Sequence, residues 1–167
     1  MTGLEDLPVE LLVDIFLWLA ASDVAHAIMV SHVCAHWRTV ALNAPSLWSI
    51  LVLCSGFVVE KTETWIRRSD GHIRELRVAH LPNSYPDDCI TALHMMNWDH
   101  VRILRVHAIA THPIMKCLEA KEKLHVIPNN LDEFEILSDD RVYAKVATPF
   151  LRRFNDSNLR SLTVHGM

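Results

Sequence analysis

The stretch that decides the fold of the N-terminal part reads LPVELLVDIFLWLA over residues 7–20. Its proline suits the first position of a helix, because that position needs no backbone N–H donor. Glu10 would then lie in the first turn, where a carboxylate meets the positive end of the helix dipole. Apolar residues follow the helical period at Leu11, Leu12, Ile15, Phe16 and Leu19. The stretch therefore predicts a helix that starts at Pro8.

The same stretch is apolar almost all round. Its second side carries Val13, Leu17, Trp18 and Ala20, and Asp14 is nearly the only polar break. A helix with this pattern must be buried on nearly every side. A unit of three short helices cannot cover it alone, so we expect part of its surface to contact another protein.

Further elements are expected downstream. Ser22 is a favourable N-cap for a second helix, which would carry Val24, Ala27 and Ile28. A third helix would carry Val33, Cys34, Trp37, Val40 and Ala41 and end at the sequence Asn43-Ala44-Pro45. After Leu47 and Trp48, the continuous apolar run at residues 50–53 predicts a buried strand. A helix over residues 60–69 is expected to stop at Asp70-Gly71.

A repeat follows in the C-terminal part. Four segments share an L-x-x-L-x-L type of pattern and begin at residues 73, 101, 131 and 159, which gives intervals of 28, 30 and 28 residues. Helices are expected between them at 87–97, 113–124 and 141–147. A period of this length is typical of solenoids, and the pattern resembles leucine-rich repeats. The repeats are Ile73-x-x-Leu76-x-Val78, Val101-x-x-Leu104-x-Val106, Leu131-x-x-Phe134-x-Ile136 and Leu159-x-x-Leu162-x-Val164.

The N-terminal segment resembles the F-box family. The residues that carry the resemblance are Leu7-Pro8-x-Glu10-Leu11-Leu12-x-x-Ile15-Phe16-x-x-Leu19, Val33-Cys34-x-x-Trp37-Arg38-x-x-Ala41-Leu42 and Pro45-x-Leu47-Trp48. The closing P-x-LW, with a strand and a helix after it, looks most like the F-box proteins abundant in mushroom-forming fungi. The expected fold class is α+β, with a three-helix F-box domain at residues 4–53. A short leucine-rich-repeat-like α/β solenoid would follow at 54–167.

The resemblance implies binding to a Skp-type adaptor within an SCF-type cullin ubiquitin ligase. The repeats would then bind an unknown target protein, which makes the chain a substrate receptor without catalysis of its own. The expected adaptor-binding residues are Leu7, Pro8, Leu11, Leu12, Ile15, Phe16, Leu19, Val33 and Trp37. Any of Ile15, Leu19, Val33 and Ala41 could instead belong to the internal core. Leu17 and Trp18 could face the repeats.

Composition and charge narrow the class of protein. Half of the 167 residues are hydrophobic, so a packed core is feasible. Residues 1–59 hold five acids and one base, a balance of −4, and the remainder holds fifteen of each sign. No basic stripe favours a nucleic-acid or membrane partner. Four cysteines without a CxxC pair, and an acidic N-terminus, predict free thiols and a cytoplasmic or nuclear location.

Metal and catalytic sites have weak support. His32, Cys34 and His36 are close in sequence, but Cys34 would point away from the helix face that the two histidines share. Structural zinc needs four ligands, so we expect no metal and no cofactor. Cys34 as a nucleophile is equally disfavoured, because it lies on the apolar side of its predicted helix. A small metal- or thiol-dependent enzyme remains the third hypothesis, after a scaffold or regulator that binds the adaptor alone.

Two features of the C-terminal part leave alternatives open. The acids Asp132, Glu133, Glu135, Asp139 and Asp140 surround one predicted strand and form either a solvated surface or a docking edge for a basic partner. The last strand pattern ends at Val164, close to the end of the sequence, without the polar cap that solenoids usually need. This ending is the one expected if the sequence is a fragment, or a shortened relative, of longer receptors.

Overall fold

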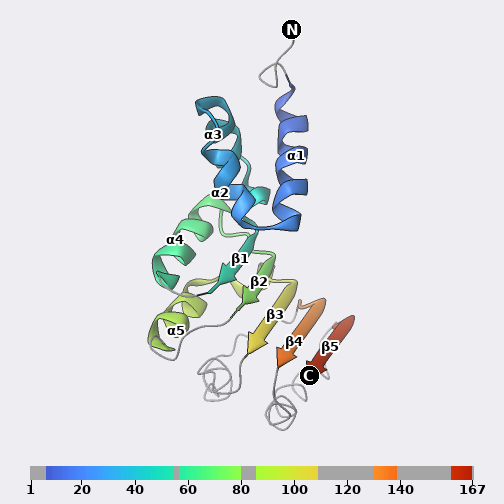
Figure 1. The fold of residues 1–167 in the computed structure, drawn as a ribbon. Helices are drawn as coiled ribbons and strands as arrows, with labels where there is room; N and C mark the ends of the chain where they lie inside the picture. Colours follow the sequence, from blue (N-terminus) through green and yellow to red (C-terminus); the bar gives the residue numbers. More distant parts are fainter. Residues whose placement is uncertain (1–6, 55–56, 80–85, 109–129, 139–158, 167) are drawn as a thin grey trace.

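A computed structural model describes residues 7–54, 57–79, 86–108, 130–138 and 159–166. The helices predicted at 113–124 and 141–147 lie outside these residues. Within them, the chain combines a helical N-terminal part with one parallel sheet, which agrees with a mixed helix-and-strand fold (Figure 1). No helix of the described part is long and apolar enough to cross a membrane.

The helical part contains α1 (Val9–Ser22), α2 (Ala25–Ser31), α3 (Ala35–Leu42) and the short 3-10 helix η2 (Pro45–Trp48). Helix α1 begins at Val9, one residue after the predicted start, and Pro8 is its N-cap. Ser22 ends α1 instead of capping α2, and its hydroxyl donates to the Leu19 carbonyl at 2.7 Å. The N-cap position of α2 is Val24, and one residue earlier the Asp23 Oδ1 accepts the Ala25 N–H at 2.9 Å.

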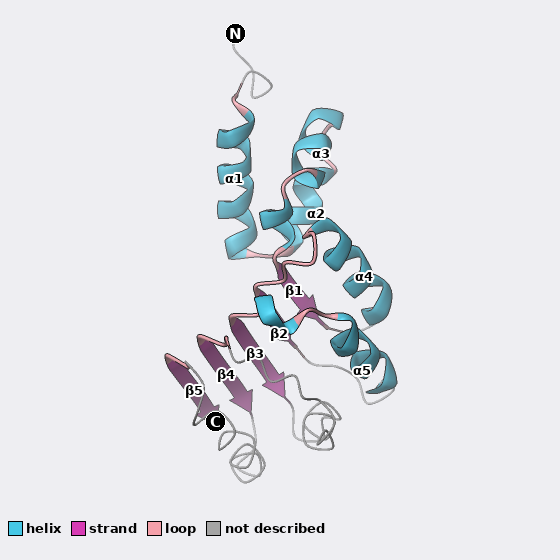
Figure 2. Ribbon diagram, turned by 180° about the vertical axis from the view of Figure 1, so that it is seen from behind, coloured by secondary structure: helices cyan, strands magenta, loops and turns pink. Residues whose placement is uncertain are grey.

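The five strands pair in parallel and follow chain order (Figure 1). They are β1 (Ile50–Leu53), β2 (Glu75–Val78), β3 (Ile103–Ala108), β4 (Glu133–Ser138) and β5 (Ser161–Gly166). Helix α4 (Val58–Arg68) connects β1 to β2, and α5 (Pro86–Met95) with η3 (Trp98–His100) lies between β2 and β3. Figure 2 shows α4 and α5 stacked along the β1 and β2 end of the sheet. All four predicted repeat strands are therefore present.

The register aligns the repeated apolar positions across the sheet. One row joins Leu51, Leu76, Leu104, Phe134 and Leu162, and a second joins Leu53, Val78, Val106, Ile136 and Val164. The described members of both rows in β1 to β4 are buried. Because side chains alternate across a strand, the residues between these rows point to the opposite face, called here the outer face.

The first repeat begins inside the helical part, which the sequence pattern had not revealed. Trp48-x-x-Leu51-x-Leu53 follows the repeat pattern 25 residues before Ile73. The N–H groups of Arg74 and Glu75 both donate to the Ser49 carbonyl, at 2.8 and 3.1 Å. The same paired bonds recur before β3, β4 and β5. Trp48 thus takes the position that Ile73, Val101, Leu131 and Leu159 take in the later repeats.

Trp48 connects the helical part to the sheet. Its side chain has no exposed surface, and its indole N–H donates to the Ala41 carbonyl at 2.8 Å. The Trp65 ring meets it edge-on with 5.2 Å between centroids, and the Arg68 guanidinium lies 4.2 Å from the ring centre. Burial, and then the charge of Arg67, lower the pKa of Arg68. One hydrophobic core consequently runs from the helices into the sheet.

The predicted stop of the helix before β2 is confirmed at Asp70-Gly71. Both residues have positive φ, 54° and 75°, and the Gly71 N–H donates to the Ile66 carbonyl at 2.8 Å. A left-handed turn with such a bond is the usual end of a helix at glycine. The helix itself begins at Val58, two residues before the predicted start.

Replacing Trp48 with alanine should lower the free energy of unfolding by about 3–5 kcal/mol, because removal of the buried indole leaves a cavity and the Ala41 carbonyl loses one of its donors. Urea unfolding followed by circular dichroism measures this. Trp18→Ala is the matched control, since Trp18 is 78% exposed and its removal should change stability by about 0.5 kcal/mol or less. Equal losses in the two variants would contradict the role given to Trp48.

Candidate functional site

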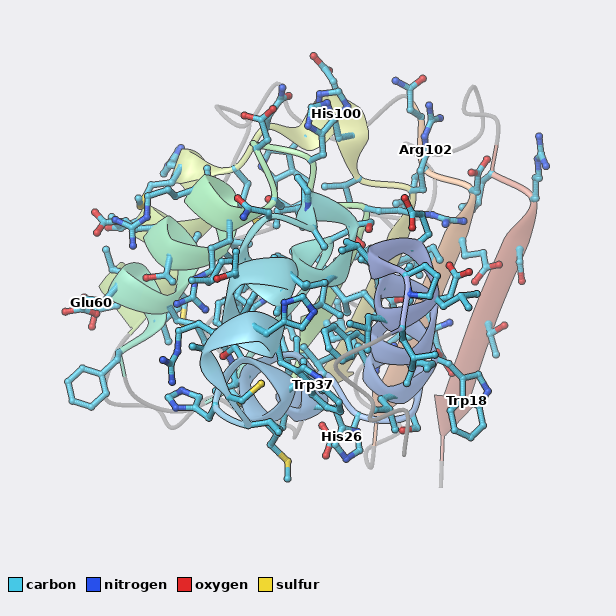
Figure 3. All side chains as sticks on the ribbon, turned by 90° about the horizontal axis from the view of Figure 1, so that it is seen from above. Trp18, His26, Trp37, Glu60, His100 and Arg102 are labelled. Atoms are coloured by element: carbon cyan, nitrogen blue, oxygen red, sulfur yellow. The ribbon has the colours of Figure 1, made fainter. Side chains whose placement is uncertain are left out.

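Helix α1 has an apolar exposed face and an apolar buried face. Leu11, Ile15 and Trp18 are spaced like neighbours on one side of a helix, and they are 49%, 40% and 78% exposed. Figure 3 shows Trp18 projecting away from the other helices. Leu12, Phe16 and Ala20 lie on the opposite side and are buried in the core. The exposed set Leu11, Ile15 and Trp18 is called here the α1 stripe.

The predicted adaptor-binding residues divide into surface and core. Pro8, Leu11, Ile15 and Val33 are exposed. Leu7, Leu19 and Trp37 are partly buried and pack against the core. Leu12 and Phe16 have no exposed surface in this structure, and the Phe16 ring lies 5.0 Å from the Trp37 ring.

Burial also shows which of the other residues considered for the core or for the sheet lie there. Ala41 is buried in the core, whereas Ile15 and Val33 are not. Leu17 faces the sheet across a small hollow, but Trp18 is exposed to solvent. Further exposed apolar side chains on α2 and α3 are Ile28, Met29 and Leu42. The helical part therefore presents more apolar surface than its own core uses.

Cys34 has a structural role at the start of α3. The predicted third helix included Val33 and Cys34, but α3 begins at Ala35 because Cys34 is extended and acts as its N-cap. The Cys34 Sγ accepts the Trp37 N–H at 3.4 Å. His32 and His36 are exposed. In the described residues, no group of three or more His, Cys, Asp or Glu side chains could hold a metal ion.

The outer face of the sheet carries a network of ion pairs that the sequence pattern did not reveal. Arg105 in β3 bonds three carboxylates: Glu75 of β2 and Glu135 and Glu133 of β4, the last two at 2.9 and 3.6 Å. Arg77 also contacts Glu75, at 2.6 Å. Two signals were present in the sequence: the shared L-R-V pattern of β2 and β3, which places Arg77 and Arg105 side by side, and the acids Glu133 and Glu135 in the predicted strand that became β4.

A hollow of about 290 Å³ lies where the C-terminal end of α1 meets the outer face. Its walls come from α1, η2 and the starts of β1, β2 and β3. Its lining is largely apolar and consists of Leu17, Ala20, Ala21, Ser46, Leu47, Ser49, Ile50, Arg74, Glu75 and Ile103. The hollow thus joins the helical part to the outer face of the sheet.

Taken together, the fold defines a mixed helix-and-strand protein whose N-terminal helices expose apolar side chains. Residues 4–54 match the family model described as F-box-like. The match ends just after β1, so it includes the strand that begins the sheet. The comparisons with curated proteins and with solved structures gave no match. The N-terminal part of this chain therefore carries an F-box-like domain.

Adjacent residues on α1 should respond differently to truncation. Phe16→Ala should lower the free energy of unfolding by about 3–5 kcal/mol, because Phe16 is fully buried. Ile15→Ala should cost only about 0.5–1 kcal/mol, since much of its side chain already contacts water. Chemical denaturation of the two variants measures both values. A large loss for Ile15→Ala would mean that this residue belongs to the core.

Proposed function

We propose that this chain is the substrate-recognition subunit of an SCF-type cullin ubiquitin ligase. The observation that carries the proposal is the α1 stripe, which lies inside the segment that matches the F-box-like family. The family match supports adaptor binding in general. The stripe adds a physical reason, because exposed apolar residues on one helix face favour burial against a partner.

The surface for the Skp-type adaptor is proposed to include Pro8, Leu11, Ile15 and Val33, with the exposed parts of Leu7 and Trp37. Full burial of a Leu or Ile side chain contributes roughly 1.5–3 kcal/mol. Several such side chains support stable association after the costs of ordering are met. Leu12, Phe16 and Leu19 would act indirectly, by holding α1 against α2 and α3.

The chain is proposed to resemble the F-box proteins of mushroom-forming fungi, and its sheet to belong to a short leucine-rich-repeat-like solenoid that presents its outer face to a target protein. The in-register parallel strands at intervals of 25 to 30 residues support this. Because the helices and the sheet share one core, a bound target would be held at a fixed position relative to the adaptor. Ubiquitin transfer would then be accelerated by proximity, while the chemistry belongs to other subunits.

Combined Pro8→Ala, Leu11→Ala and Ile15→Ala substitutions should weaken binding to a recombinant Skp-type adaptor by about a hundredfold. Two or three partly exposed side chains would each lose on the order of 1 kcal/mol of contact. Calorimetric titration of purified adaptor measures the change. Phe57→Ala is the control, because Phe57 is 83% exposed but lies at the start of α4.

Equal affinity of the adaptor for the wild type and the triple variant would remove the basis of the proposal. A second measurement separates receptor from scaffold. A receptor should assemble with adaptor and cullin together, as seen by size-exclusion chromatography of the mixed proteins. Binding of the adaptor without entry of the cullin would instead favour a regulator that holds the adaptor alone.

A further inference from the structure

We propose that the outer face binds an extended segment of a protein that carries a Lys or Arg close to a bulky apolar residue. The apolar side chain would fill the hollow beneath α1, and the cation would lie over Glu133 and Glu135. The inference rests on the proposed function, since it names the class of target that the receptor would hold. It is carried by the charge balance of the outer face and by the lining of the hollow.

The charge balance favours a basic partner. In the described strands, the outer face holds the acids Glu75, Glu133 and Glu135 and the bases Arg77 and Arg105, which gives one negative charge in excess. Arg74, just before β2, lines the hollow and offsets this excess there, so the carboxylates left for a partner are those of β4. Glu75 is nearly buried and is bonded by both arginines, so it offers little to a partner.

Glu133 is the carboxylate with the most unused capacity. Its side chain is 49% exposed, and in the described residues only Arg105 approaches it, at 3.6 Å. Glu135 shares the same arginine and is 29% exposed. On β5 the neighbouring positions are Ser161 and Thr163, which bring no cation. A Lys or Arg from a partner would supply the missing charge and could bond both carboxylates.

The hollow favours an apolar side chain. Six of its lining residues are apolar, and they come from α1, η2, β1 and β3. Its volume of about 290 Å³ lies at the lower limit of sites for small molecules, and it opens beside the outer face. A single bulky side chain of a bound segment therefore fits it better than a cofactor does.

The two subsites are aligned by the register of the sheet. Ile103 lines the hollow and is the direct partner of Glu133 on the next strand. Strands lie about 4.8 Å apart, so the middle of the hollow, near β2, is roughly 10 Å from Glu133. An extended chain that crosses the strands advances about 3.3 Å per residue. Because side chains alternate along an extended chain, the cation and the apolar anchor can both point to the sheet only when they are an even number of residues apart. The bound segment should therefore carry its cation about two or four residues from its apolar anchor.

The test uses random peptides displayed on phage and selected against the full wild-type chain. Selected peptides should contain a Lys or Arg about two or four residues from a bulky apolar residue. Synthetic versions of these peptides should bind a Glu133→Lys/Glu135→Lys variant at least about tenfold more weakly, as measured by fluorescence anisotropy. The reason is that two lysines, which repel the cation of the peptide, replace two carboxylates that attract it. Ala21→Trp should weaken peptide binding by a similar factor, because Ala21 lines the hollow at an exposed position and the larger side chain would fill it.

Matched controls exclude general effects of charge and size. Glu60→Lys/Glu63→Lys makes the same charge change on α4, and Figure 3 shows Glu60 on the opposite side of the molecule from β5. Ala25→Trp adds the same bulk at an exposed position on α2. Both controls should bind the peptides as the wild type does.

The inference is overturned by any of three results: no binding peptide is selected, the selected peptides are acidic, or the variants and controls bind equally well. Its failure can be distinguished from failure of the proposed function. A Leu11→Ala/Ile15→Ala variant should lose the adaptor and keep the peptides, whereas Glu133→Lys/Glu135→Lys should lose the peptides and keep the adaptor.

Discussion

The burial of Trp48 is the constraint on which the rest of the structure depends. Its indole N–H donates to the Ala41 carbonyl near the end of α3, and its ring packs on Trp65 and Arg68 of α4. It also takes the first position of the first repeat. The helices and the sheet are therefore built around one side chain, so the domain that matches the F-box-like family and the sheet do not form separate cores.

Much of the fold could be predicted from periodicity. The start of α1 to within one residue, the bounds of β1 and the presence of the four later strands were all predicted from the sequence. The spacing of apolar residues indicates which positions are buried, and Gly, Pro and Asn indicate where turns occur. The F-box-like match was predicted from three spaced motifs. The repeat at Trp48 was missed because the pattern begins in a 3-10 helix, where a strand period is not visible.

The site was harder to predict, for a physical reason. Ile15 and Phe16 are adjacent in sequence, and both are apolar, yet one is exposed and the other has no exposed surface. On a helix that is apolar all round, the pattern does not say which face meets the core and which meets a partner. The ion-pair network around Arg105 was hidden for a related reason, since Arg105 lies on β3, its partners lie on β2 and β4, and they meet only through the register.

The chain-order sheet has a consequence for how the molecule is made. Each of the five described strands pairs only with the strand before or after it in chain order, so none of them depends on a strand from a distant part of the sequence. During synthesis the helical part and β1 leave the ribosome first, and they offer a finished edge on which β2 can form. Growth in this order closes one loop of about 25 to 30 residues at each step, so each strand edge before the last is open only until the next repeat has been made.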